Sequence, residues 1–164
     1  AIAHFAGIDA EVIAKVLREF QGVEHRIELC NEIDGIRFVN DSKGTNPDAA
    51  IRAIEAMKRD IILIAGGYDK GASFDEFVSA FDGKVKALVL LGKTATKIKG
   101  AAEKAGFTNT VILKDMEACV REAYRLAESG DVVLLSPACA SWDMYTSFEQ
   151  RGEHFKACVR ELER

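Results

Sequence analysis

The 164-residue sequence has no apolar run close to the ~18 residues that a membrane-spanning helix needs, and no basic-then-apolar signal segment at its start. Its four cysteines form no C-x-x-C pair, and its three histidines have no metal-ligand spacing. We therefore expect reduced thiols in a cytoplasmic protein rather than a metal site or a disulfide framework. The sequence also lacks an excess of positive charge, with 22 lysines and arginines against 26 acidic residues, and the net charge of −4 argues against partners such as nucleic acid or an anionic membrane.

What the sequence does contain is typical of one folded globular domain. Apolar residues make up 48% and charged residues 29% of the chain. The first residue is Ala1 rather than an initiator Met, so we expect a piece of a longer protein. The first predicted helix ends near Gln21-Gly22-Val23. We therefore predict that residues 1–22 are the tail and linker of a preceding domain and that residues 23–164 are the domain proper.

Hydrophobic periodicity divides the chain into alternating elements. Helical spacing predicts a first helix over residues 9–20, and two strands at 25–31 and 35–40 follow, joined by a turn at Asp34-Gly35. Continuous apolar runs predict buried strands at 61–66, 86–92, 110–114 and 131–136. Amphipathic segments predict helices at 47–58, 74–81, 94–105, 115–128 and 148–162, with Ser73–Glu76 and Ser147–Gln150 as capping boxes.

Buried strands that alternate with amphipathic helices indicate βαβ units. The expected fold is α/β: a Rossmann-like, mostly parallel, doubly wound sheet with an N-terminal β-hairpin and helices on both faces. In such sheets, ligands bind beyond the carboxyl ends of the strands.

Three polar loops follow predicted strands, at residues 40–46, 66–71 and 136–143. Their sequences are NDSKGTN, GGYDKG and SPACASWD. Alone, the first loop fits a capped turn with solvated charges and the second fits ordinary turn chemistry. The third favours function, because its small residues between a buried strand and a helix suggest backbone packed tightly against something. Because parallel strands end at one edge, we expect the three loops to share one rim. Together they offer two lysines, three carboxylates, several hydroxyls and glycine-rich backbone whose N–H groups can face an anion, and their convergence favours a site for a small anionic substrate.

A fourth strand is followed by Gly92-Lys93-Thr94, which looks like the end of a phosphate-binding P-loop. That motif requires a glycine five positions before Gly92, where this chain has Ala87, and residues 88–91 are predicted strand. We interpret the segment as a strand-to-helix turn.

Four motifs together resemble a known family. HRIE (25–28), NDSKGTN (40–46), GGYDKG (66–71) and SPACASWDMYTSFEQRGEHF (136–155), in this order, resemble the C-terminal domain of the bacterial Mur ligases, and among these the D-glutamate-adding branch. The resemblance implies a three-domain protein in which residues 1–22 end a central ATPase domain. That central domain would mainly hold the phosphates of ATP and the Mg²⁺ ion.

The resemblance also implies a reaction in peptidoglycan precursor synthesis. ATP converts the carboxylate of UDP-N-acetylmuramoyl-L-alanine to an acyl phosphate, the amine of D-glutamate attacks, and phosphate leaves. This chain would then supply only part of the site, so we expect it to be inactive alone, and the family favours a monomer.

The resemblance further implies roles for individual residues. The nucleotide would be held by Arg26 and Asp41, and Lys43 would act as the catalytic residue that stabilises charge at the reacting centre. The D-glutamate-binding residues would be Thr45, Lys70, Ser141 and Phe148. Because D-glutamate carries two carboxylates, its site needs two or more cations or N–H clusters, which the rim lysines could supply.

Two alternatives remain open from the sequence. The first is a domain of a related ligase, such as another Mur enzyme or folylpolyglutamate synthase, that adds a different amino acid. The second is a non-catalytic Rossmann-like module that binds a nucleotide or an amino acid. An upstream reading frame with a G-K-[ST] motif would distinguish an enzyme from such a module.

Overall fold

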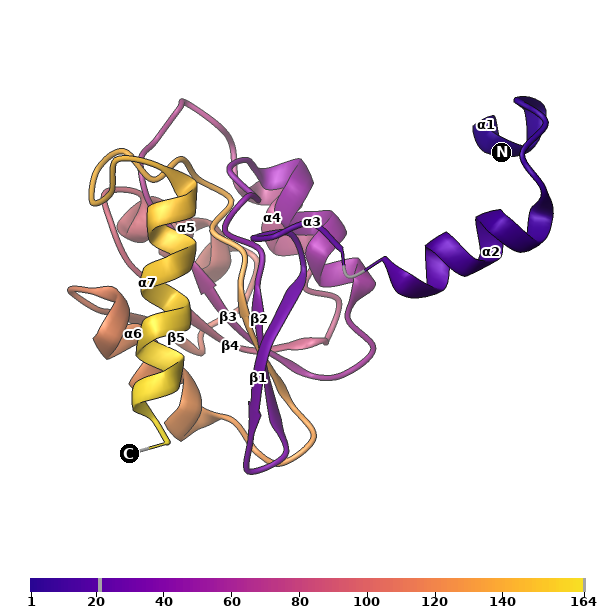
Figure 1. Cartoon of the computed structure of the whole chain (residues 1–164). Helices are drawn as coiled ribbons and strands as arrows, with labels where there is room; N and C mark the ends of the chain where they lie inside the picture. The colour runs from indigo at the N-terminus through magenta and orange to yellow at the C-terminus, as the bar shows by residue number, and fades with distance from the viewer. Residues whose placement is uncertain (21, 164) are drawn as a thin grey trace.

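The computed structural model describes residues 1–20 and 22–163 of the chain. One six-stranded sheet has the order β1-β2-β6-β3-β4-β5 (Figure 1). Its strands are β1 (Glu28–Ile33), β2 (Ile36–Asn40), β3 (Ile61–Ala65), β4 (Val85–Leu90), β5 (Thr110–Ile112) and β6 (Val132–Leu135). β1 pairs antiparallel with β2, and the other neighbouring pairs are parallel, which confirms the predicted α/β sheet with its hairpin.

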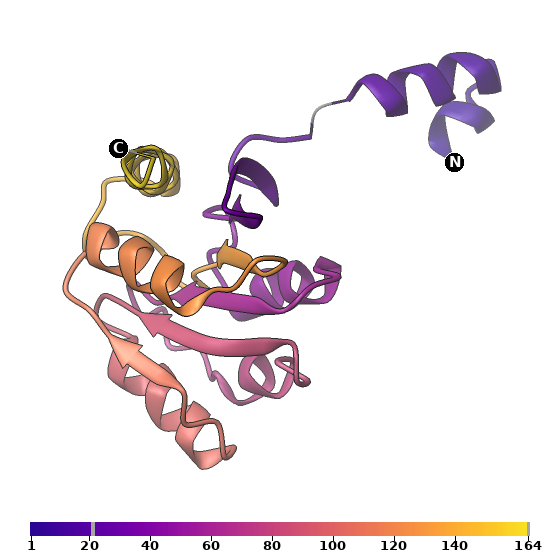
Figure 2. The same cartoon turned by 90° about the horizontal axis from the view of Figure 1, so that it is seen from below.

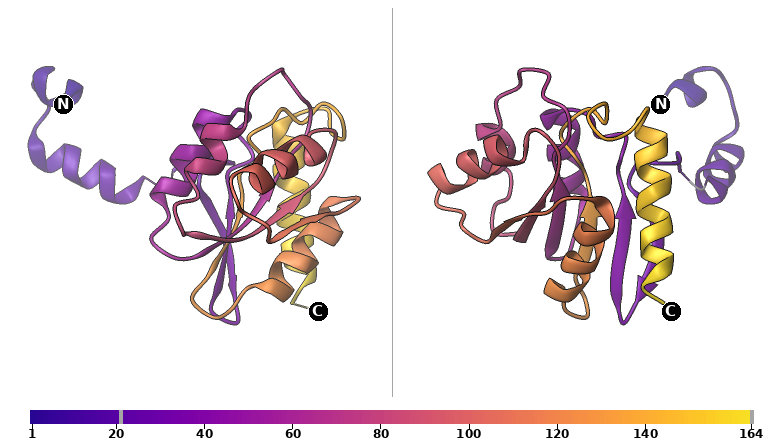
Figure 3. Two further views of the ribbon diagram at one scale, coloured as in Figure 1. Left: turned by 180° about the vertical axis from the view of Figure 1, so that it is seen from behind. Right: turned by 90° about the vertical axis from the view of Figure 1, so that its left-hand side faces the viewer.

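Helices cover both faces of this sheet, as Figure 3 shows. The helices are α1 (Ile2–Phe5), α2 (Ala10–Glu19), α3 (Pro47–Ala56), α4 (Asp75–Ser79), α5 (Ala95–Lys104), α6 (Met116–Leu126) and α7 (Phe148–Glu161). α3, α4 and α5 pack on one face of the sheet, and α6 and α7 pack on the other.

The central strand β3 shows why the sheet is buried on both sides. Ile61, Leu63 and Ala65 belong to the core beneath α3, α4 and α5, whereas Ile62 and Ile64 belong to the core beneath α6 and α7. Successive side chains of a strand point to opposite faces, so a run of five apolar residues fills two cores at once.

The N-terminal hairpin differs from its predicted boundaries. β1 begins at Glu28 rather than at His25. The reason is backbone conformation: φ is 61° at His25 and 47° at Ile27, which is the left-handed region and incompatible with a strand. The predicted hairpin turn is confirmed, with φ of 52° at Asp34 and 77° at Gly35, because both central residues of a type I′ turn need positive φ.

One predicted capping box is wrong and the other is half correct. The Ser73 hydroxyl donates to the carboxylate of Asp75 instead of forming a box with Glu76, and α4 begins at Asp75 with Phe74 as its cap residue. The carboxylate of Asp75, two residues after Ser73, therefore binds the hydroxyl that the predicted box would have used. At α7, Gln150 N donates to Ser147 Oγ (3.2 Å) as expected. The Gln150 side chain, however, accepts from Thr146 N rather than from Ser147 N.

The two N-terminal helices stand away from the sheet (Figures 1 and 2). α2 begins at the predicted cap Asp9, whereas α1 was not predicted. Neither helix buries a residue, and the apolar face of α2 is exposed: Val16 is 57%, Leu17 70% and Phe20 63% exposed. At the predicted boundary, Gln21 lies outside the described residues. In the described part of the chain, none of the helices has the length and apolar character needed to cross a membrane.

Candidate functional site

The three polar loops lie on one edge of the sheet, at the top of Figure 1. The strands that precede them, β2, β6 and β3, are neighbours in this order. We call residues 40–46, 136–143 and 66–71 the rim loops. Backbone hydrogen bonds link the last two, from Gly66 N to Pro137 O (2.9 Å) and from Tyr68 N to Ala140 O (2.8 Å). The prediction of a shared rim is therefore confirmed.

Asp41 is buried at the start of its rim loop, with 4% of its surface exposed. One carboxylate oxygen accepts from Ser136 Oγ (2.7 Å), and the other accepts from Ile27 N (3.3 Å). Burial raises the pKa of Asp41 above its ordinary value, although Ser136 and Ile27 stabilise the charged form. The carboxylate thus connects its own loop to the left-handed turn 25–27 and to the rim loop 136–143.

Arg26 sits in that turn, between the two left-handed residues, and is exposed. The turn is also tied to the catalytic candidate Lys43, whose N–H donates to His25 O (3.0 Å). Lys43 is half-buried, and its ammonium lies 5.6 Å from the centre of the Phe148 ring, within cation–π range.

The four predicted amino-acid-binding residues occupy different environments. Phe148, the first residue of α7, is half-buried, and its carbonyl accepts from Ser42 Oγ (2.8 Å). Ser141 is 2% exposed. Thr45 is half-buried, and its N–H donates to Lys43 O (2.9 Å). Lys70 is exposed and makes no hydrogen bond or ion pair with any residue that the structure describes. All four lie on the rim loops or the adjoining start of α7.

Arg151 is the residue at this rim that the sequence reasoning missed. Its side chain is 2% exposed, and its guanidinium donates to Ser42 Oγ (3.0 Å), Ser42 O (2.8 Å) and Cys139 O (3.1 Å). Burial lowers the pKa of Arg151 to about 10, so it stays charged at neutral pH. One cation therefore fastens two rim loops to α7. Its signal in the sequence is its position one turn before Phe155, on the apolar face of α7.

His25 is a second buried group beneath the start of α7, at 5% exposure. Its Nδ1 lies 3.0 Å from the Asn40 amide nitrogen, which can only donate, so Nδ1 is the acceptor in this pair. A Cβ on Gly152 would lie 2.3 Å from Nδ1, so this contact requires glycine in α7. The contact between His25 and Gly152 thus packs the turn before β1 against α7.

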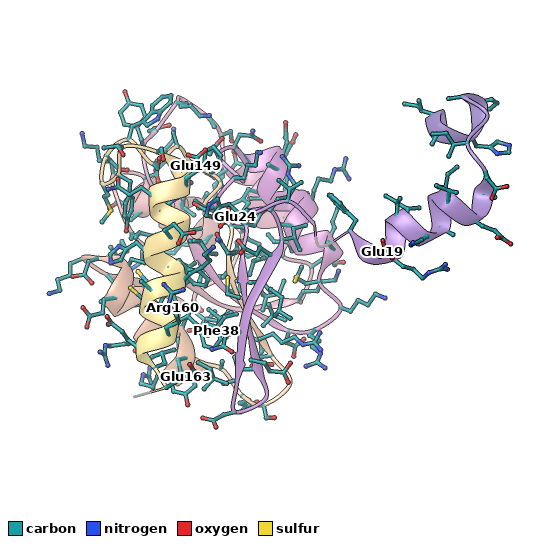
Figure 4. The ribbon with its side chains drawn as sticks, viewed as in Figure 1. Glu19, Glu24, Phe38, Glu149, Arg160 and Glu163 are labelled. Atoms are coloured by element: carbon teal, nitrogen blue, oxygen red, sulfur yellow. The ribbon has the colours of Figure 1, made fainter. Side chains whose placement is uncertain are left out.

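Among the residues that the structure describes, one group near the rim has the spacing to be considered as a metal site, and its surroundings do not suit Mg²⁺. Glu24, His25 and Glu153 come close enough together to be considered, but the ammonium of Lys156 lies 2.8 Å from Glu24 and 2.7 Å from Glu153. The ammonium of Lys156 thus already pairs with both glutamates, and hard Mg²⁺ prefers oxygen ligands to imidazole. Figure 4 shows Glu24 beside α7, and Glu149 at the end of that helix that meets the rim.

Comparison with known proteins places this arrangement among ligases. The family model described as "Mur ligase, glutamate ligase domain" matches residues 25–139. The chain is 58% identical over 166 aligned positions to UDP-N-acetylmuramoylalanine–D-glutamate ligase of Thermoanaerobacter pseudethanolicus, with 100% of this chain and 37% of that protein covered. The protein of the same name from Clostridioides difficile is 56% identical, with 99% and 36% covered. The chain thus spans little more than a third of these relatives.

Solved structures with low sequence identity share the fold. UDP-N-acetylmuramate–alanine ligase of Thermotoga maritima has a TM-score of 0.71 at 15% identity, covering 98% of this chain and 36% of that one. The bifunctional folylpolyglutamate synthase/dihydrofolate synthase of Yersinia pestis, solved with AMPPNP and Mn, has a TM-score of 0.63 at 15% identity, covering 96% and 35%.

Proposed function

This chain belongs to the Mur ligase family, whose glutamate ligase domain it matches, and we propose that it forms the amino-acid-binding wall of a ligase that joins D-glutamate to UDP-N-acetylmuramoyl-L-alanine. The names of its most similar relatives supply the substrates. In this proposal, residues 23–164 are the C-terminal domain, and residues 1–22 belong to the central domain that precedes it. The protein acts in the cytoplasm as a monomer.

The observation that carries the proposal is the distribution of charge on the rim. Arg151 and Asp41 are buried, with their hydrogen-bonding groups used inside the protein. Lys43 and Lys70, in contrast, form no direct ion pair among the described residues, although Lys43 interacts at longer range with the exposed carboxylate of Glu149. Two ammonium groups without a direct ion pair, on loops joined by buried hydrogen bonds, suit a substrate with two carboxylates.

The proposed chemistry is ATP-dependent formation of an amide bond. The carboxylate of the nucleotide substrate becomes an acyl phosphate, the amine of D-glutamate attacks it, and the tetrahedral intermediate releases phosphate. Lys43 stabilises the negative charge that develops at the reacting centre. Arg26, exposed on its turn, contacts the nucleotide, and Asp41 orients that turn through its bond to Ile27 N. Thr45, Ser141 and Phe148 line the amino-acid side.

The metal and the reactive phosphates belong to the central domain in this proposal. We therefore expect no ATP hydrolysis by the chain alone.

Phosphate release by the full-length protein tests the proposal. With ATP and UDP-N-acetylmuramoyl-L-alanine present, D-glutamate should stimulate release, and L-glutamate and diaminopimelate should not. Stimulation by another amino acid would identify a related ligase instead. Strong nucleotide binding by the chain alone, without ligase activity in the full-length protein, would favour a binding module.

The residue assignment has its own test in Lys70→Ala. Loss of one charge-assisted bond costs about 1.5–3 kcal/mol, so the KM for D-glutamate should rise about ten- to a hundredfold while the KM for ATP changes little. Lys104→Ala, which removes an exposed lysine from the far end of α5, is the matched control. Equal changes in both KM values would refute the role of Lys70.

A further inference from the structure

The turn Gly92-Lys93-Thr94 is packed into the rim, although the rim loops follow other strands. Lys93 N donates to a carboxylate oxygen of Asp143 (2.8 Å), in the loop after β6. A Cβ on Gly92 would lie 2.5 Å from the same oxygen and 2.9 Å from the Cα of Gly67. The turn between β4 and α5 therefore touches two of the three rim loops.

The Thr94 side chain makes the closest link. It is 1% exposed, and its hydroxyl accepts from Gly67 N (2.9 Å) and donates to Gly67 O (3.0 Å). Its oxygen also lies 3.2 Å from the sulfur of Cys139. A hydroxyl has one proton and two acceptor sites, so the Cys139 thiol is the donor in this pair. Burial raises the pKa of Cys139 to about 11, and the thiol therefore keeps its proton at neutral pH.

A second bond from α5 reaches the same loop two residues later. One oxygen of Asp69 accepts from Lys97 Nζ (2.9 Å), and the other accepts from Gly71 N (2.7 Å). The loop is thus bonded to the turn and α5 at Gly67 and Asp69, both before Lys70, and the bond from Gly71 N to Asp69 closes the loop around Lys70. These bonds use the hydrogen-bonding groups of the neighbours and leave the Lys70 ammonium unpaired among the described residues.

We propose that Thr94 is a positioning residue for the amino-acid site, because it fixes loop 66–71 so that Lys70 meets a carboxylate of the incoming amino acid. This inference rests on the proposed function and deepens it. An ammonium on a fixed loop loses less conformational freedom when a ligand binds. The nucleotide-side residues Arg26 and Asp41 make no hydrogen bond with Thr94 among the described residues. Loss of the Thr94 hydroxyl should therefore weaken the binding of D-glutamate and not that of ATP.

Thr94→Val tests this in the full-length enzyme, since valine keeps the shape and removes the hydroxyl. The KM for D-glutamate should rise on the order of tenfold, with the KM for ATP and kcat within about twofold. Thr94→Ser should restore the wild-type KM, and Thr96→Val, in the exposed part of α5, should have no effect. An unchanged KM for D-glutamate, or equal changes for both substrates, would overturn the inference.

Amide hydrogen exchange in the 164-residue chain separates this inference from the proposed function. The Gly67 amide should be protected in the wild type and should exchange about tenfold faster in Thr94→Val. Unchanged exchange overturns the inference even in an active enzyme. An enzyme that does not use D-glutamate overturns the proposed function, and with it the role of Thr94. If Thr94→Val does not fold, Lys97→Gln decides: a higher KM for D-glutamate alone supports the tethered loop, and an unchanged KM overturns it.

Discussion

Arg151 illustrates how a single buried charge can organise a site without touching a substrate. Its guanidinium holds Ser42 and Cys139, which follow different strands. Its hydrogen bonds go to carbonyl and hydroxyl oxygens, and the carboxylates of Asp143 and Asp41, beyond ion-pairing distance, also favour its charged form. The planar guanidinium of arginine, with its several donors in a fixed geometry, suits this arrangement, whereas the compact ammonium of lysine does not.

Arg151→Lys should therefore destabilise the protein strongly although it conserves charge. A lysine ammonium can donate to only some of the three acceptors that Arg151 reaches. Leaving the other acceptors buried and unpaired should lower the free energy of unfolding by about 2–4 kcal/mol. Urea denaturation measures this difference. Arg160→Lys, on the exposed face of the same helix, is the control and should stay close to the wild type. Similar stability of the two variants would show that the buried fork is unimportant.

Asp41, unlike Arg151, is expected to lower the stability of the fold when it is charged. Because burial raises its pKa, the folded state binds a proton more readily than the unfolded state. The charged carboxylate therefore destabilises the fold above the ordinary pKa of aspartate, by about 1.4 kcal/mol for each unit of elevation, and this cost disappears at lower pH.

Asp41→Asn should accordingly unfold at a higher temperature than the wild type at pH 7, with the difference shrinking towards pH 3. At the same time the KM for ATP of the full-length enzyme should rise. Asp115→Asn is the comparison: a bond from Ala118 N lowers the pKa of Asp115, so that variant should lose stability at pH 7. A melting temperature of Asp41→Asn that falls at neutral pH would contradict the argument.

At the scale of elements, the turn 25–27 shows a local conflict between sequence and conformation. A β-branched residue in the left-handed region is strained by about 1–2 kcal/mol, and Ile27 adopts φ of 47° with 40% of its surface exposed. The hydrogen bond from the Ile27 N–H to the Asp41 carboxylate helps to hold the residue in this conformation. The strain coincides with the turn that presents Arg26.

Ile27→Gly should therefore be tolerated far better than an ordinary apolar-to-glycine change. Relief of strain offsets the lost packing, so the free energy of unfolding should stay within about 1 kcal/mol of the wild type. Leu29→Gly, a more exposed residue in β1 with no positive φ, should lower it by about 1–2 kcal/mol. Chemical denaturation of both variants gives the comparison. A larger loss in Ile27→Gly would argue against strain.

These elements also show what the sequence could predict. The strand Ile61–Ala65 was predictable because burial on both faces produces a continuous apolar run. The turn 25–27 was not, because local propensity favours a strand there and the bond from Ile27 to Asp41 spans 14 positions. Arg151 was missed for the same reason: its partner Ser42 is 109 positions away. Pattern reasoning found the rim loops, but not the buried residues that fasten them.

At the scale of the whole molecule, the two N-terminal helices contribute little to the folded core. α1 and α2 bury no residue, and Figure 1 shows them apart from the sheet. Both sheet faces are covered by α3 to α7. The cooperative unit should therefore consist of the residues that follow the linker.

Removal of residues 1–22 should accordingly change the free energy of unfolding by less than about 0.5 kcal/mol, as surface changes do. Thermal unfolding followed by circular dichroism measures it, with a single transition in both proteins. Removal of residues 148–164 is the contrasting truncation: it deletes α7, which buries Phe155, Cys158 and Val159, and should prevent folding. A large loss of stability in the shorter truncation would show that α1 and α2 belong to the core.

The position of β6 also bears on how the protein is made. Although β6 is the last strand in the sequence, it lies between β2 and β3 and forms the whole parallel connection between them. A ribosome will have released β2 to β5 long before residues 132–135 emerge, and until then the hairpin has no partner in the sheet. Such distant pairing slows folding. The rim can therefore form only after β6 and the loop 136–143 have been made, so a shorter nascent chain does not yet hold its lysines on a complete rim.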